Sequence, residues 1–227
     1  MAAFIESATR ALGLGYSVFP VSVFQDASGK RQKLPLVKWS EYSKRKPTVA
    51  ELKQWSDLWP WAGIGIPTGN GLAVIDIDRK DERPLDATRV MQAFDWYQPE
   101  DWPAFCQTAG GGMHLYARAS GPVANAVAIA SADGMAIDIR GDGGYVVGPG
   151  STLWSCDMRE PVAGSHALGS YDGHLERRED LPSFPTELAP VRKEPDYKKL
   201  LDYPVIPSGM KHGVMASAAM VWAKKVG

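Results

Sequence analysis

Polar side chains alternate with apolar ones in three short segments of the 227-residue chain. The polar positions are Asp76 with Asp78, His114 with Tyr116, and Asp138 with Arg140. Alternate side chains of a β-strand share a face, so each segment is predicted to form a strand with one polar face. Packing the apolar faces on helices would gather the polar groups on one exposed sheet surface. Three carboxylates and a histidine in that arrangement are typical of a two-metal site for phosphoryl transfer.

Each of these features also has an ordinary structural explanation. The pair Asp76 and Asp78 can simply end a strand with solvated acids, and a single histidine can serve packing alone. The glycines at 110–112, just before His114, would let backbone amides approach phosphate oxygens closely, but they can equally form a hairpin turn. The residues alone leave these alternatives open.

The remaining segments predict the elements that position these strands. Apolar residues at helical spacing predict a helix over residues 2–12, and Thr48 with Glu51 forms a capping-box signature for a second helix. Asp86 can cap a third helix that runs to about Tyr97. Alternation and turn residues predict strands at residues 16–21, 71–78, 104–108, 113–117, 135–140 and 145–147. Pro20 suggests an edge position or a strand end for the first of these.

The composition, with 44% hydrophobic and 22% charged residues, is typical of a soluble chain with one sizeable core. No apolar run is long enough to cross a bilayer, and the N-terminus lacks a secretory leader. We therefore expect a cytoplasmic protein without a membrane partner. Cys106 and Cys156 have no other cysteine or histidine at metal-binding spacing, so we expect buried thiols and no zinc.

Basic residues are concentrated between positions 25 and 46. This segment holds seven lysines and arginines and two acidic residues, which gives it a net charge of +5. A basic segment beside an acidic cluster suits a polyanion that is handled through bound cations. The candidate DNA-binding residues in this segment are Lys33, Lys38, Lys44 and Arg45. The alternative is a solvated basic loop.

The order of these segments resembles the bifunctional DNA primase/polymerase (prim-pol) domain of the archaeo-eukaryotic primase superfamily, found in phage and plasmid replication proteins. The resemblance covers about residues 8–188. It rests on a helix followed by residues 15–21, and on Lys33-Leu34-Pro35 with Trp39. Three further motifs lie at residues 63–69 with 74–78, at 108–116 and at 137–147.

The resemblance implies an α/β (α+β) protein with the archaeo-eukaryotic primase catalytic fold, in which an RRM-like sheet carries the active site beside an N-terminal α/β module. It implies a nucleotidyltransferase that acts on a single-stranded DNA template, a primer and nucleoside triphosphates. The implied roles are two Mg²⁺ or Mn²⁺ ions on Asp76, Asp78 and Asp138, and nucleotide binding by His114, Gly111, Gly112 and Arg140. Some relatives carry a zinc-bearing stem, for which this chain lacks the cysteines.

Two other functions compete with this interpretation. A replication-initiator endonuclease on a related sheet would nick DNA through a tyrosine, but it normally needs two metal-binding histidines close together. The four histidines of this chain are scattered, at His114, His166, His174 and His212. A catalytically silent nucleic-acid binder would leave the three acids unexplained.

Prolines and charges after residue 181 predict a domain end, so we expect a catalytic domain over residues 1–190 and a linker over 191–207. Residues 208–227 carry an amphipathic helical pattern that resembles the start of the C-terminal helical domain in longer phage and plasmid proteins. We therefore expect an N-terminal part of a larger replication protein, in which a helicase often follows. If the protein is phage-encoded, its location is the host cytoplasm.

Overall fold

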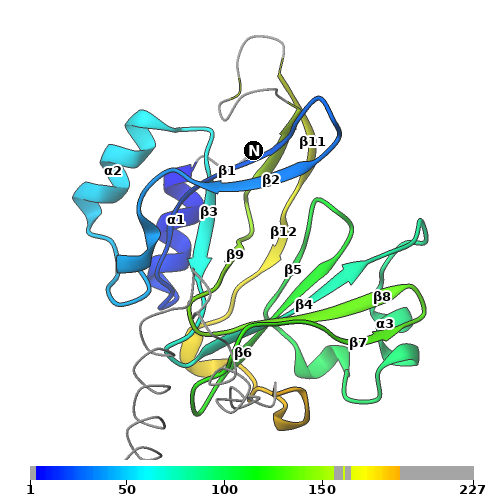
Figure 1. The fold of residues 1–227 in the computed structure, drawn as a ribbon. Helices are drawn as coiled ribbons and strands as arrows, with labels where there is room; N and C mark the ends of the chain where they lie inside the picture. Colours follow the sequence, from blue (N-terminus) through cyan, green and yellow to red (C-terminus); the bar gives the residue numbers. More distant parts are fainter. Residues whose placement is uncertain (1–3, 156–160, 162–164, 190–227) are drawn as a thin grey trace, which may run out of the picture. The chain divides into compact units, whose positions relative to one another are not determined.

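The computed structural model describes residues 4–155, 161 and 165–189, and these form two six-stranded sheets with three α-helices (Figure 1). The predicted α/β class, with a sheet that carries the candidate site and an N-terminal α/β module, is confirmed. No helix within the described ranges is long and apolar enough to cross a membrane. The predicted linker and C-terminal helix, like Cys156, lie outside the described residues.

The first sheet has the strand order β11-β10-β1-β3-β9, and β2 pairs with the other side of β1. These strands are β1 (Phe19–Gln25), β2 (Arg31–Pro35), β3 (Gly63–Pro67), β9 (Tyr145–Val147), β10 (Thr152–Ser155) and β11 (His166–Ser170). Helices α1 (Phe4–Gly13) and α2 (Val49–Leu58) pack on this module, with the Phe4 and Trp55 rings 6.4 Å apart. The predicted capping box of Thr48 and Glu51 starts α2.

The second sheet is antiparallel throughout, in the order β12-β5-β6-β4-β8-β7. Its strands are β4 (Leu72–Arg79), β5 (Phe105–Gln107), β6 (Met113–Arg118), β7 (Ala126–Ala132), β8 (Met135–Arg140) and β12 (Asp172–His174). Ile75, Ile77 and the apolar residues of β6 and β8 pack with α3 (Ala87–Ala93) in one core. The acidic strand β4 is therefore a buried central strand, as predicted.

Several local predictions were wrong. Residues 31–35, where no strand was predicted, form β2, because Asp26 accepts bonds from the amides of Ser28 and Lys30 and so turns the chain back onto β1. The prediction for Pro20, by contrast, is confirmed: it is the second residue of β1, and on the side of β2 the pairing begins only at Val21. Strand β7 was missed although Asp133-Gly134, both with positive φ, is a strong hairpin signal. Helix α3 ends at Ala93, before the predicted Tyr97.

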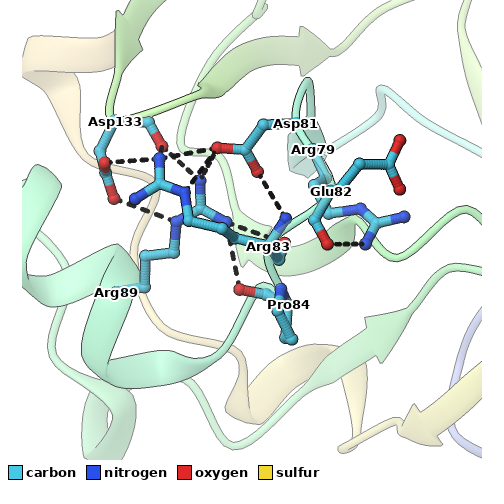
Figure 2. Close-up of polar contacts among 7 residues, drawn as sticks. All are labelled: Arg79, Asp81, Glu82, Arg83, Pro84, Arg89 and Asp133. Carbon is cyan, nitrogen blue, oxygen red and sulfur yellow. Dashed lines mark hydrogen bonds and ion pairs between the residues drawn. The ribbon is translucent and has the colours of Figure 1, made fainter.

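An ion-pair network ties the loop after β4 to the β7–β8 turn and to α3 (Figure 2). The buried Arg89 guanidinium contacts the carboxylates of Asp81 at 2.7 Å and Asp133 at 3.0 Å, and it also donates to the carbonyls of Arg83 and Pro84. Arg83 contacts the same two carboxylates, each at 2.7 Å. The network thus fixes the chain immediately after the acids of β4.

We expect Arg89→Met to lower the melting temperature by several degrees at pH 7, because it removes a buried guanidinium that bonds two carboxylates and two backbone carbonyls. Hydrogen bonds from Arg83 and Arg89 lower the pKa of Asp133. The resulting stabilisation is present above the ordinary aspartate pKa and is lost as the pH falls through the lowered value. Melting curves from pH 7 to 3 should therefore show the variant and the wild type converging in acid.

The matched control is Arg177→Met, since Arg177 is exposed and reaches Glu179 only at 3.9 Å. It should leave the melting temperature unchanged. An equal deficit of Arg89→Met at pH 7 and pH 3 would contradict an electrostatic role for the network.

Candidate active site

The candidate residues form a row across four neighbouring strands of the second sheet. Asp76 on β4 pairs in register with His114 on β6 and with Asp138 on β8, and His114 pairs in turn with Cys106 on β5. Directly opposed residues of antiparallel strands point to the same face. The shared polar face that the alternation predicted is therefore present.

This face is covered, and the expectation of an exposed surface was wrong. Asp76 and Asp138 are each only 5% exposed and His114 is 1% exposed. Residues beside the strands of the first sheet provide the cover: the Tyr16 ring lies 6.1 Å from Tyr116, and the Tyr171 ring lies 6.4 Å from His114. The acids thus lie between the two sheets, next to apolar side chains.

The guanidinium of Arg140 bridges the two buried carboxylates. Its Nη2 lies 3.1 Å from Asp76 Oδ2 and 2.7 Å from Asp138 Oδ2. The second oxygen of Asp138 accepts a 2.8 Å bond from the amide of Ala128, which lies at the irregularity of β7 with a φ of 50°. Asp78, at the more exposed end of β4, instead pairs with Lys80 at 2.9 Å.

Burial and charge act in opposite directions at Asp76. Burial alone would raise the pKa of this carboxyl, but the nearby His114, Lys33 and Arg140 together lower it below its usual range. Burial lowers the pKa of His114 to about 4, and the charge of Asp76 offsets this only in part. At neutral pH we therefore assign an ionised Asp76 and a neutral His114.

His114 contacts the acid row through one nitrogen only. Its Nε2 lies 3.5 Å from Asp76 Oδ1. Its Nδ1 and the hydroxyl of Tyr116 are buried without a hydrogen-bond partner in the part of the chain that the structure describes. A buried polar atom without a partner is costly, so both atoms are candidates for a contact that forms only with a bound molecule.

The donor chemistry of the row fits a divalent metal ion, since hard cations prefer carboxylate oxygens. Asp76 and Asp138 already converge on one cationic nitrogen. Within the described ranges, however, no three His, Cys, Asp or Glu side chains lie close enough together to hold a metal. Binding at all three acids therefore requires Arg140 to withdraw from the carboxylates and Asp78 to leave Lys80.

The glycine turn at residues 110–112 is the hairpin between β5 and β6. The amide of Gly111 donates to the Thr108 carbonyl at 2.8 Å, and the amide of Gly112 donates to the Thr108 hydroxyl at 3.0 Å. Both amides are thus used inside the turn. A β-carbon at Gly112 would lie 2.6 Å from the Ile77 carbonyl, so the close approach that requires glycine here is to β4.

The four predicted DNA-binding residues fall in different environments. Lys33 on β2 is close enough to the acids to lower the pKa of Asp76. Lys38 is exposed, just before a 3-10 helix. Lys44 lines two pockets of about 550 and 490 Å³. Arg45 is paired with Glu41 at 2.8 Å and with Glu51 at 2.7 Å, which anchors it to the start of α2.

Comparison with known proteins completes this description. A search of curated proteins found no match. The family model for the bifunctional DNA primase/polymerase N-terminal domain matches residues 8–168, which include every candidate site residue and all strands of the two sheets except part of β11 and the whole of β12. The family implies DNA primase/polymerase activity, with DNA and nucleotides as substrates. This chain belongs to the bifunctional DNA primase/polymerase (Prim-Pol) family.

Proposed function

We propose that this chain starts and extends DNA primers on a single-stranded template by a nucleotidyl transfer that depends on Mg²⁺ or Mn²⁺. The observation that carries the proposal is the shared contact of Asp76 and Asp138 with one nitrogen of Arg140 on a covered sheet face. Buried carboxylates that bracket a cation suit its exchange for metal ions. Asp78 follows Asp76 on the same strand face and completes the set of three acids.

Asp76, Asp78 and Asp138 would hold two metal ions, whose chemistry is to activate the attacking 3′-hydroxyl and to neutralise the leaving pyrophosphate. The chain itself supplies position and charge. Neutral His114 contacts Asp76 through Nε2. Its Nδ1, which has no hydrogen-bond partner among the described residues, would contact the triphosphate. Arg140, released from the carboxylates, would face the nucleotide, while Gly111 and Gly112 keep the turn close to β4.

The single-stranded template would follow the basic side of the pockets at the start of β4. The two pockets adjoin, since Ser43, Lys44, Gly69 and Asn70 line both. The larger one also reaches the loop after β6 and the turn after β8, so it lies at the sheet end away from the glycine turn. A polar groove with a lysine at its edge suits a phosphate backbone.

The nicking endonuclease is the weaker candidate. His114 is buried beside Asp76, and His174 contacts Glu176 at 2.9 Å. No metal-binding group of histidines forms within residues 4–155, 161 and 165–189. Nucleotide incorporation on a single-stranded template, run beside a nicking assay, separates the two functions: incorporation without nicking is expected.

The biological setting is part of the same proposal. We infer a replication protein of a phage or plasmid that acts in the cytoplasm, in the host cell where a phage encodes it. Its catalytic domain would span residues 1–190, followed by a linker over 191–207, and residues 208–227 would open a helical domain that precedes a helicase.

We expect Asp76→Asn and Asp138→Asn each to reduce nucleotide incorporation by at least about 100-fold, because each removes a charged metal ligand while keeping the side chain's shape. Asp78→Asn should also reduce it and raise the Mg²⁺ concentration required. The assay is labelled nucleotide incorporation across a Mg²⁺ and Mn²⁺ titration. Asp57→Asn, on the exposed side of α2, is the control that should keep full activity. Full activity of any one of the three site variants would remove that residue from the metal site.

For the template path we expect Lys44→Ala to weaken binding of a single-stranded oligonucleotide and to reduce the salt slope of log K by about 1, the change that follows loss of one phosphate contact. Arg45→Ala is the matched neighbour: it should mainly lower the melting temperature, because Glu41 and Glu51 hold its guanidinium. Fluorescence anisotropy at several salt concentrations measures both. An unchanged slope for Lys44→Ala would mean that the basic segment is solvated.

A further inference from the structure

Arg31, at the start of β2, places its guanidinium against the glycine turn between β5 and β6. A β-carbon built on Gly110 would lie 2.5 Å from Arg31 Nη1. The next atoms it would meet are Arg31 Cζ at 3.5 Å and Thr108 Oγ1 at 3.6 Å. The Arg31 guanidinium thus packs directly against Gly110, in a contact between the two sheets.

The guanidinium is accessible and has no partner of opposite charge. Arg31 is exposed, and among the described residues no ion pair or side-chain hydrogen bond engages its guanidinium. Arg83 and Arg89, by contrast, share Asp81 and Asp133 in the network of Figure 2. An arginine held in place without a carboxylate is suited to bind an anion.

Arg31 also lies near residues that cover the acid row. Alternation along β2 places it on the same strand face as Lys33, whose charge acts on both Asp76 and His114. The charge of Arg31 lowers the pKa of Tyr171, against the stronger effect of burial, and the Tyr171 ring lies 6.4 Å from that of His114. Lys33 thus acts on the acid row from the first sheet, and Arg31, two residues before it, lies against the glycine turn.

We propose that Arg31, seated on Gly110, binds the distal phosphates of the incoming nucleoside triphosphate. The amides of Gly111 and Gly112 are already bonded to Thr108, so this guanidinium would supply donors in their place. A planar fork of N–H groups can hold two phosphate oxygens at once. The inference rests on the proposed nucleotidyl transfer, to which it adds a residue outside the acid row.

The substitution Gly110→Ala can disturb the contact between Arg31 and Gly110 alone. Gly110 does not have a positive φ, so alanine fits its backbone without strain, and the only close clash is with the flexible end of Arg31. Gly110→Ala therefore displaces the guanidinium while the turn stays intact. Gly13→Ala is the glycine control, because a β-carbon there meets nothing within 4 Å.

Arg79 provides the matched arginine control. It also contacts the turn, with Cζ and Nε 3.0 Å from a β-carbon placed on Gly111. By strand alternation, however, it follows Ile75 and Ile77 onto the face of β4 that points away from the acids. Its Nη1 donates only a 3.3 Å bond to the Glu82 carbonyl (Figure 2).

The experiment measures binding of dATP and dAMP with Mg²⁺ by calorimetry, together with the KM for dATP in primer extension. Arg31→Met and Gly110→Ala should each raise the Kd and KM for dATP about tenfold, while the Kd for dAMP stays constant. The double variant should be no weaker than Arg31→Met alone, because both changes remove one contact. Arg79→Met and Gly13→Ala should match the wild type.

The inference is overturned by equal losses for dATP and dAMP, by no loss for either, or by an additive double variant. It is also overturned if the wild type binds no dATP, or if the variants bind dATP normally and a dT oligonucleotide more weakly. The last would make Arg31 a DNA contact. A wild type that binds dATP through Arg31 but incorporates none would defeat the polymerase proposal and leave the phosphate site standing. Normal primer extension with an unchanged KM for dATP in Arg31→Met would leave the polymerase proposal standing and overturn the role of Arg31.

Discussion

Two carboxylates buried side by side would repel each other and lose their hydration, and the Arg140 guanidinium between Asp76 and Asp138 makes the arrangement stable. The rest of the site follows from that pairing. The register of β4 with β8 brings the two acids opposite each other, and the irregularity of β7 turns the Ala128 amide toward Asp138. The two buried acids therefore have a counterion that belongs to the protein itself.

Local periodicity predicted much of the site but not its cover. Alternation in β4, β6 and β8 sufficed to assign the acids and His114 to one face, because neighbouring antiparallel strands keep opposed residues on the same side. Tyr16 and Tyr171 close over that face from distant parts of the chain. No pattern of spacing around the acids encodes such long-range packing, so an exposed surface was expected where a covered one exists.

The same limit explains the errors in secondary structure. Strand β2 begins with three polar residues and has only Leu34 and Pro35 as apolar ones, so its strand character depends on pairing with β1 and not on its own composition. At the glycine turn, sequence left a hairpin and a phosphate cradle as alternatives. Thr108 accepts bonds from the amides of Gly111 and Gly112, which accounts for the hairpin. The cationic groups beside the turn come from β2 and β4, and the sequence around the turn does not reveal them.

Strand β4 belongs to two cores at once. Leu72 and Val74 pack beneath the first sheet on the side of the acids, while Ala73, Ile75 and Ile77 pack with α3 on the other side. Inserting one residue would turn the isoleucines toward the acid site and the carboxylates into the α3 core. The hairpin turn at residues 26–30 is exposed and has no such double constraint. Changes in chain length among relatives should therefore collect in turns of that kind and spare β4.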